Sequence, residues 1–284
     1  MNTALPRTPA DALQHARACG IERLDAQLLL THVTGQSRTW LLAHDRDPLQ
    51  PEQAARFVDL VTRRAAGEPA AYLLGDKEFF GLTLQVTPAT LIPRPDTETL
   101  VDWALEHIPE QPRADSSPFA VLDLGTGSGA IALALAHRRP HAAVTAVDAS
   151  ADALAVAAAN ARALGLPLRC LHGSWLTPVT GERFDLIVSN PPYIAEGDPH
   201  LTALTHEPIT ALTAGPDGLD DIRHIVAHAA AHLRPGGWLL LEHGYDQAEV
   251  VTALLRAAGF TDVATRIDLG GQPRCTGGRA SITG

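Results

Sequence analysis

The tetrapeptide Asn190-Pro191-Pro192-Tyr193 is the stretch of this chain whose residue types most clearly suggest chemistry. It follows an apolar run over 184–189 that is typical of a strand, so it is expected at the carboxyl end of a sheet, where open α/β sheets bind their ligands. The Asn190 side-chain oxygen and the Pro191 carbonyl are acceptors, Pro192 stiffens the loop, and Tyr193 supplies a flat face. Together these residues predict a clamp for a planar –NH2 group.

A glycine-rich turn upstream predicts a nucleotide site. The run over 121–124 is typical of a buried strand and the alanine-rich run over 130–136 of a helix; between them stand Gly125, Thr126, Gly127, Ser128 and Gly129. Glycines in such a turn let the backbone approach a ligand, and the helix N–H groups point at it. A second strand ends in Asp148, 19 positions after Gly129 (148 − 129), and an acid at that spacing suits a ribose diol.

The acid ahead of the turn, Asp123, argues against a dinucleotide as the ligand. Its carboxylate would repel a pyrophosphate, and the turn reads G-T-G-S-G rather than G-x-G-x-x-G. It would attract an ammonium instead, such as the amino acid end of S-adenosylmethionine. A glycine turn alone is also typical of a strand-to-helix connection without ligand, but the acids and the distant clamp favour a site.

Further motifs extend over nearly the whole chain, and with them the sequence closely resembles the bacterial release factor glutamine methyltransferases, which are class I S-adenosylmethionine-dependent enzymes. Asn-Pro-Pro-Tyr alone is shared with adenine and guanine amino methyltransferases, whereas the stretch Ile92–Glu98 is much more specific. The other matching stretches are Gly67–Gly75, Glu78–Leu82, Pro88–Leu91, Asp217–Asp220, Pro235–Trp238 and Glu242–Gly244.

The resemblance implies an α/β fold with a mostly parallel seven-stranded Rossmann-like sheet, a C-terminal antiparallel hairpin and a small all-α domain in front. It implies that the glycine turn cradles the methionine portion of S-adenosylmethionine, Asp148 binds the ribose and Trp175 lies beside the adenine. The methyl acceptor is then the side-chain nitrogen of the glutamine in the Gly-Gly-Gln loop of class I release factors. Family members often carry Ser-Asp-Trp where this chain has Gly173-Ser174-Trp175, so one acid near the adenine is missing.

Methylation of an amide requires action on a lone pair that is delocalised into the carbonyl. If the two amide hydrogens donate to the Asn190 oxygen and the Pro191 carbonyl, electron density rises on nitrogen and the lone pair is aimed at the methyl-sulfonium. The methylated nitrogen then loses its proton without a dedicated base. Arg94 and Glu98 fit two roles equally well, a salt-bridged hinge or a wall of the acceptor tunnel.

Composition limits the class of protein and its partners. The chain has 284 residues and a mean hydropathy of +0.01, with no apolar run long enough to span a membrane and no signal peptide, so we expect a cytoplasmic protein. Cys19, Cys170 and Cys275 are widely separated and predict neither a disulfide framework nor a zinc site. His224, His228 and His232 would share a helix face, and we interpret them as surface residues rather than as metal ligands.

Charge favours a basic protein partner over a nucleic acid. The net charge is −10, and residues 1–74 hold eight arginines and eight acids, so the entire acidic excess lies in residues 75–284. We expect a monomer that needs neither nucleic acid nor membrane. Three rivals are an amino methyltransferase acting on nucleic acid, a methyltransferase for a ribosomal protein glutamine, and a non-catalytic binding protein with this fold.

The pattern of apolar residues divides the chain into three parts. Residues 1–74 are typical of four or five helices that dock the substrate, residues 75–96 of a linking β-hairpin, and residues 97–284 of the methyltransferase domain. A helix near 97–108 precedes expected strands at 119–124, 143–147, 168–171, 184–189 and 237–242. Two last runs, Val263–Leu269 and Arg279–Thr283, flank Gly270–Pro273 and predict a terminal hairpin.

Overall fold

The computed structural model describes residues 5–281, and the chain divides into two compact units, Met1–Asp76 and Lys77–Gly284. The first unit is helical, as its spacing of apolar residues predicts. In its longest helix, α4, the buried residues Ala54, Phe57, Leu60 and Val61 recur at helical spacing, and the last three share a core with Leu29 and Leu30. The helices of this unit are α1 (Pro9–Ala18), α2 (Arg23–Thr34), α3 (Arg38–Ala43), α4 (Pro51–Ala65) and α5 (Ala70–Leu74).

A two-stranded hairpin, β1 (Asp76–Phe79) and β2 (Leu82–Gln85), belongs to the second unit except for its first residue, Asp76. Its turn residues Phe80 and Gly81 have φ of 52° and 80°, as a tight turn with two left-handed positions requires. Phe79, Leu82 and Leu84 pack into the core of the second unit, and the backbone of Gln85 is hydrogen-bonded in both directions to the Asn160 side chain. The hairpin is therefore part of the core that supports the larger sheet.

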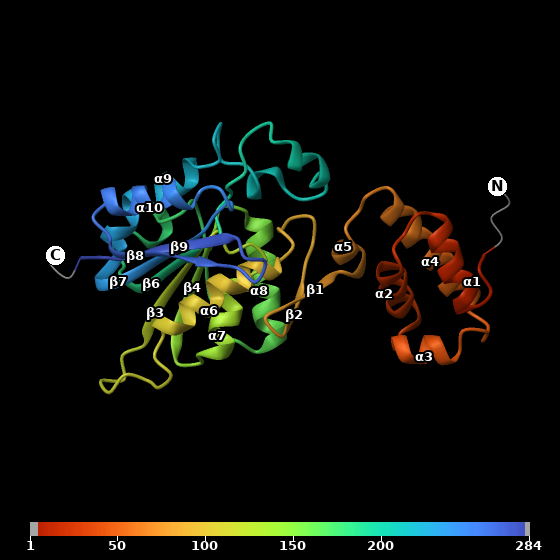
Figure 1. The fold of residues 1–284 in the computed structure, drawn as a ribbon. Helices are drawn as coiled ribbons and strands as arrows, with labels where there is room; N and C mark the ends of the chain where they lie inside the picture. The colour runs from red at the N-terminus through yellow and green to blue at the C-terminus, as the bar shows by residue number, and fades with distance from the viewer. Residues whose placement is uncertain (1–4, 282–284) are drawn as a thin grey trace. The chain divides into compact units, whose positions relative to one another are not determined.

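The second unit is built on a seven-stranded sheet in the order β5-β4-β3-β6-β7-β9-β8. All pairs from β5 to β7 are parallel, and β9 is antiparallel to both of its neighbours, which confirms the expected fold class (Figure 1). β3 and β6 occupy the predicted residues because each is a continuous apolar run bounded by turn residues. The strands are β3 (Phe119–Leu124), β4 (Ala142–Asp148), β5 (Arg169–His172), β6 (Phe184–Ser189), β7 (Leu233–Glu242), β8 (Thr261–Ile267) and β9 (Pro273–Arg279).

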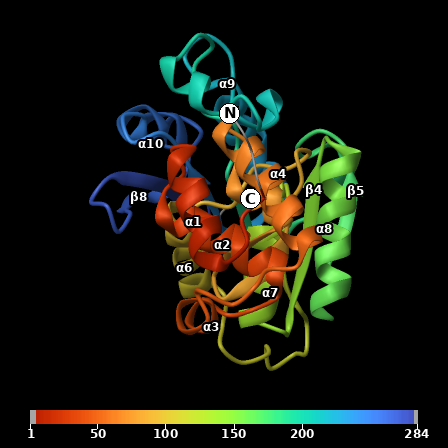
Figure 2. The same ribbon diagram turned by 90° about the vertical axis from the view of Figure 1, so that its right-hand side faces the viewer.

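Helices cover both faces of this sheet. α6 (Glu98–His107) and α7 (Ala130–Arg138) bury their apolar faces against one side, together with the β1–β2 hairpin. α9 (Asp220–Ala229) and α10 (Ala248–Ala257) cover the other side (Figure 1). α8 (Ala151–Leu164) lies beside β4 and β5 at the edge of the sheet, as Figure 2 shows. Two covered faces leave the carboxyl ends of the strands as the place for a ligand.

The last strand corrects the prediction from sequence. The expected strand over 279–283 is wrong: β9 runs over Pro273–Arg279, and Ile282 and Thr283 lie outside the described residues. Its centre is glycine-rich, which hides it from a pattern based on β-branched and aromatic residues. Glycine is required there, because a Cβ at Gly277 would stand 2.4 Å from the Leu240 side chain and 2.7 Å from the Leu239 carbonyl oxygen.

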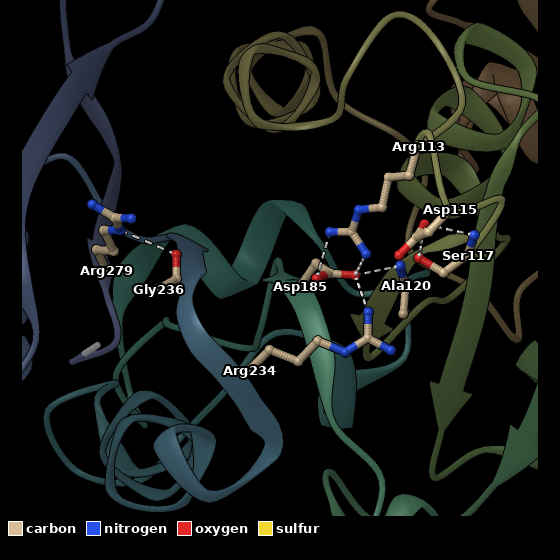
Figure 3. A network of polar contacts seen from close by, with 8 residues as sticks. All are labelled: Arg113, Asp115, Ser117, Ala120, Asp185, Arg234, Gly236 and Arg279. Atoms are coloured by element: carbon tan, nitrogen blue, oxygen red, sulfur yellow. Dashed lines mark hydrogen bonds and ion pairs between the residues drawn. The ribbon is translucent and has the colours of Figure 1, made fainter. Parts of the chain in front are cut away.

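At the amino-terminal end of the sheet, Asp185 gathers the polar contacts drawn in Figure 3. Its carboxylate accepts hydrogen bonds from Arg113 at 2.8 Å, Arg234 at 2.6 Å and the Ala120 N–H at 2.8 Å. Burial opposes its ionisation, but these donors hold the pKa of Asp185 below its usual value. The network fixes the connector over 111–118, which precedes β3, at the end of the sheet opposite Asn190.

The three histidines of the α9 region do not share one helix face. His224 and His228 lie on α9 with ring centroids 4.6 Å apart, but α9 ends at Ala229, and His232 closes a 3₁₀ turn and bonds the Glu182 carbonyl. Among residues 5–281, no group of three His, Cys, Asp or Glu is arranged to hold a metal ion. Within the same range, no helix is long and apolar enough to cross a membrane.

Candidate active site

The strands β3, β4, β6 and β7 end side by side at the carboxyl end of the sheet, which is called its carboxyl edge below. Register aligns Leu124 of β3 with Val147 of β4 and Ser189 of β6, and Ser189 with Leu241 of β7. The residues that directly follow these partners along the chain are Gly125, Asp148, Asn190 and Glu242. Parallel pairing therefore brings to one edge residues that are up to 117 positions apart (242 − 125).

The larger of two cavities at this edge has a volume of about 390 Å³, within the range of small-molecule sites. Four of the predicted cofactor residues line it: Gly125, Gly127, Asp148 and Trp175. The clamp residues Asn190 and Pro192 also line it, as do Asp152 and Asp221, which the sequence reasoning did not identify. The structure thus brings the glycine turn, Asp148 and the clamp together in the wall of one cavity.

Asp148 is oriented by backbone donors from both sides. Its Oδ2 accepts the Gly127 N–H at 2.8 Å and its Oδ1 accepts the Ser150 N–H at 2.8 Å. Gly127 has a φ of 57°, a left-handed conformation that favours glycine and directs its N–H toward the acid. Each carboxylate oxygen has a further lone pair, so Asp148 can still accept hydrogen bonds from a ligand.

Trp175 forms a flat wall of the same cavity. Its ring lies against Gly125, where an added Cβ would be 3.4 Å from the ring. Asp221 lines the same cavity; burial raises the pKa of its carboxyl, and the Trp175 side chain opposes that rise. The ring and this acid therefore form neighbouring parts of the cavity wall.

The other four predicted cofactor residues lie behind the cavity wall. Asp123 is fully buried, and its Oδ2 accepts the Thr126 hydroxyl at 2.7 Å and the Ala132 N–H at 3.2 Å. Ser128 is buried and its carbonyl accepts the Asn160 amide at 2.9 Å, while Gly129 caps α7 with a φ of 84°. These residues stabilise the conformation of the glycine turn and the first turn of α7.

The second oxygen of Asp123 is the unusual feature of this layer. Oδ1 is buried and accepts no hydrogen bond from residues 5–281, and burial raises the pKa of Asp123 to about 7. A buried carboxylate oxygen without a donor is costly, so a cationic or N–H-bearing ligand at the turn would stabilise it.

A smaller cavity of about 100 Å³ adjoins the larger one. Pro191 and Tyr193 line it, together with Arg94 and Glu242. Asn190 belongs to both cavities, as do Leu91 and Ala211, so the clamp stands where the two hollows meet.

The clamp residues have definite hydrogen-bond partners. The Asn190 amide N–H2 donates to the Thr97 hydroxyl at 3.3 Å, and no residue within 5–281 donates to its Oδ1. The Tyr193 hydroxyl donates to Glu242 Oε1 at 3.3 Å, and burial raises the pKa of Tyr193 so that it stays protonated. The Asn190 oxygen is therefore the acceptor that the clamp leaves for a ligand.

Arg94 has an ion-pair partner that the sequence did not indicate. It forms a salt bridge with the buried Glu207 and also lines the smaller cavity. Glu207 additionally accepts the Ile92 N–H at 3.0 Å, which ties the excursion between β6 and α9, teal in Figure 1, to the loop before α6. Glu98 instead accepts the Phe80 N–H at 3.0 Å.

Besides Asp152 and Asp221, sequence reasoning missed Thr97, Glu207 and Glu242. Glu242 carried a usable signal, because it is an acid at the end of an apolar strand, the position that also identified Asp148. Thr97 ends a 3₁₀ turn before α6 and Glu207 stands in a loop, and their partners are 93 and 115 positions away, so no local pattern indicates them.

Comparison with known proteins gives a consistent result along the chain. The PrmC N-terminal domain family matches residues 10–75 and the methyltransferase small domain family matches residues 102–215. A release factor glutamine methyltransferase of Burkholderia pseudomallei is 51% identical over 98% of this chain and 99% of its own length. The Escherichia coli protein of the same name is 47% identical over 95% of this chain and 96% of its own length.

Solved structures agree on the fold. A methyltransferase from Pyrococcus furiosus has a TM-score of 0.54 at 18% identity, covering 82% of this chain and 100% of the other. The human methyltransferase 10 domain containing protein has a TM-score of 0.54 at 19% identity, covering 80% and 98%. At these identities the likeness concerns the fold alone, whereas the sequence relatives match almost end to end. The chain therefore belongs to the release factor glutamine methyltransferase family.

Proposed function

We propose that this protein transfers a methyl group from S-adenosylmethionine to the side-chain nitrogen of the glutamine in the Gly-Gly-Gln loop of class I release factors. The observation that carries the proposal is the position of Asn190 at the junction of the two cavities. The larger cavity has the size for a nucleoside-type cofactor and the smaller one for a slender side chain. A methyl group passing from one to the other must pass the clamp.

The residues around the larger cavity fit S-adenosylmethionine. Asp123 lies behind the wall of this cavity with one oxygen that lacks a donor, so its carboxylate attracts the ammonium of the methionine portion electrostatically. Asp148 is oriented to accept from a ribose diol, and Trp175 supplies a flat face for the adenine. When bound, S-adenosylmethionine supplies an electrophilic methyl group on a positively charged sulfur.

The clamp supplies orientation and electron density. The Asn190 oxygen and the Pro191 carbonyl accept the two amide hydrogens of glutamine, which leaves the nitrogen lone pair aimed along the cavity junction. Tyr193 packs against the amide plane. Positioning of this kind contributes up to roughly 7–11 kcal/mol to a transfer step. The nitrogen gains a methyl group and loses one proton, and no residue is needed as a dedicated base.

The partners follow from this reaction. We infer that the protein acts in the cytoplasm as a monomer on a folded release factor, and that it contacts neither nucleic acid nor membrane. The acidic excess of residues 75–284 supports a basic partner surface. Mass spectrometry of release factor peptides after incubation with labelled S-adenosylmethionine tests the proposal. Methylation of a nucleic acid, with an unmodified release factor in the same mixture, would overturn it.

The chain contains an internal test of specificity, because its own β8–β9 turn carries Gly270-Gly271-Gln272. Gln272 is exposed, but its N–H and carbonyl are both bonded to Asp268, at 2.9 Å each. A closed turn cannot extend into a narrow pocket, so we expect Gln272 to remain unmethylated while the release factor glutamine is modified. Peptide mapping of the enzyme after the reaction checks this. A methyl group on Gln272 would mean that the exposed tripeptide suffices as a substrate.

Asp148→Ala is expected to weaken cofactor binding. Loss of a charge-assisted contact to the ribose costs about 1.5–3 kcal/mol, or roughly 10- to 150-fold in Kd. Calorimetric titration with S-adenosylmethionine or its demethylated product measures the change. Asp152→Ala is a useful comparison, since this acid lines the same cavity without the two backbone donors that orient Asp148. An unchanged Kd in Asp148→Ala would remove Asp148 from the cofactor site.

A further inference from the structure

Glu242 lies beneath the clamp as a buried carboxylate. It ends β7, is only 1% exposed and lines the smaller cavity. Its Oε1 accepts the Tyr193 hydroxyl at 3.3 Å, and the Thr97 hydroxyl favours the ionised form of the carboxylate. Its Oε2 is buried and has no hydrogen-bond partner within residues 5–281. Glu242 thus touches the tyrosine end of the clamp directly and the asparagine end through Thr97.

The Thr97 hydroxyl has a single hydrogen, and the direction of that hydrogen decides which half of the Asn190 amide can face it. We assign that hydrogen to Glu242, whose carboxylate can only accept, so the oxygen lone pairs are the part of the hydroxyl that faces Asn190. Only the N–H2 half of the Asn190 amide can meet a lone pair. The amide oxygen then has to point the other way, where the acceptor glutamine needs it.

Without the acceptor at Glu242, the Thr97 hydroxyl is free to turn its hydrogen toward Asn190. The asparagine amide could then flip and offer its N–H2 to the substrate –NH2, where two donors would face each other. A flipped amide has almost the same shape, so packing alone cannot prevent the flip.

Stability does not account for a carboxylate at this place. A buried carboxylate with one oxygen lacking a donor costs folding free energy, and an apolar side chain of similar size would avoid the cost. Arg274 favours the ionised form and Asp96 opposes it, and burial dominates, raising the pKa of Glu242 to about 7. The neighbouring Cys275 on β9 and Tyr193 stay protonated, because burial raises the pKa of each.

We propose that Glu242 and Thr97 are positioning residues for the methyl transfer, which orient the Asn190 amide with its oxygen toward the acceptor glutamine. The proposal rests on the proposed function, since it assigns to these residues a task in that same reaction. Neither residue contacts the transferred methyl group. Their effect is therefore expected in kcat and not in cofactor affinity.

Two pairs of variants, assayed on intact release factor, test whether Glu242 acts on Asn190 through Thr97; this series of contacts is called the relay below. Thr97→Val removes the hydroxyl and Glu242→Met removes the acceptor, and each is expected to lower kcat about 10- to 100-fold, as misplacement of a catalytic group does. Thr97→Ser keeps the hydroxyl and Glu242→Gln keeps one acceptor oxygen, so both should recover most of the activity. The Kd for S-adenosylmethionine should stay at the wild-type value in all four. Wild-type kcat in both Thr97→Val and Glu242→Met would overturn the proposal.

Thr276→Val is the matched control for a buried threonine. Thr276 is fully buried on β9, and its hydroxyl is within 2.7 Å of His243 Nε2 and 2.8 Å of the Thr265 hydroxyl. Its loss is expected to lower the melting temperature about as much as Thr97→Val does, while kcat stays near wild type. If Thr276→Val and Thr97→Val lowered kcat equally, Thr97 would have only a structural role.

Thermal melting separates the positioning role of Glu242 from a structural one. The folded pKa of about 7 exceeds the unfolded value of about 4.3, so the group loses its contribution to stability as pH rises toward and through 7. Glu242→Met removes this loss. It should therefore melt at an equal or higher temperature than wild type at pH 8, with a smaller advantage at pH 5, although its kcat is lower. A lower melting temperature at pH 8 would assign Glu242 to the structure.

The double variant Thr97→Val/Glu242→Met tests whether the two residues act in series. If Glu242 acts on Asn190 through Thr97, the combined loss in kcat is clearly smaller than the product of the two single losses. Losses that multiply would contradict the relay. Wild-type enzyme in the same assay separates this proposal from the proposed function: methylation of release factor by wild type, with independent losses in the variants, sinks the relay alone.

Discussion

Asn190→Ala is expected to reduce methyl transfer by at least about 10²–10³-fold, the loss typical for removal of one preorganised hydrogen-bonding group at a reacting centre. Its free oxygen is the only side-chain acceptor that we assign to the glutamine amide, and it stands where the two cavities meet. The contacts proposed for the cofactor come from other residues, so the Kd for S-adenosylmethionine should change little. Single-turnover kinetics, together with calorimetry, would measure both quantities.

Asn160→Ala is a control for this variant. Asn160 is a buried asparagine whose side chain bonds backbone groups of Gln85 and Ser128, and it does not line either cavity. Its loss should lower the melting temperature and, at saturating cofactor, leave kcat far closer to wild type. Near wild-type turnover by Asn190→Ala would show that the clamp interpretation is wrong.

The fold could be predicted where sequence pattern and local physics agree. β3 and β6 are uninterrupted apolar runs between turn residues, and they were predicted to the residue. β9 could not be found this way, because tertiary contact with Leu240 selects glycine at 277 against strand propensity. β7 begins at Leu233, four residues before the predicted start at 237, since Pro235, Gly236 and Gly237 conceal a strand in the sequence.

The residues of the candidate site also divide into those that a local sequence pattern indicates and those that only tertiary contacts place. Gly125, Gly127, Asp148 and Asn190 stand at strand ends or in a glycine turn, so their neighbourhood in space follows from parallel pairing. Thr97 and Glu207 depend on how loops fold back on the sheet, which no periodicity encodes. Asp123 was predicted from its charge alone, and the structure adds that it holds Thr126 and the start of α7, two contacts that no ligand is needed to explain.

The cost of buried polar groups connects these residues. Asp123 and Glu242 each keep one carboxylate oxygen without a partner within the described chain, and burial raises the pKa of each to about 7. Both stand at the carboxyl edge of the sheet, whereas Asp185 at the opposite edge is fully paired and has a lowered pKa. Buried carboxylate oxygens without a partner at one end of the sheet, and a fully paired acid at the other, are what ligand binding at the first end predicts.

Removal of the first unit is expected to cost at least about 100-fold in kcat/KM on intact release factor, and much less on a short Gly-Gly-Gln peptide. The smaller cavity admits only an amide and its immediate neighbours, so discrimination among glutamines has to come from elsewhere. The helical unit has no net charge over residues 1–74 and offers a cavity of about 530 Å³, lined by Leu13, Ile21, Leu41 and Leu42 with Gln14, Arg17, Arg23 and Asp45 among them. One or two anchor residues of about 2 kcal/mol each would account for the loss.

A chain that begins at Lys77, the start of the second compact unit, makes the comparison possible. Calorimetry with S-adenosylmethionine verifies that it is folded, because both cavities are formed by residues after 77. In the full chain, Leu42→Ser should raise KM for release factor without affecting the peptide, since Leu42 is 54% exposed in the cavity of the first unit. Val250→Ser, which alters a comparably exposed residue on α10, should change neither. Equal losses of the truncated chain on release factor and on peptide would assign residues 1–74 to stability, because a docking surface can act only on a substrate large enough to reach it.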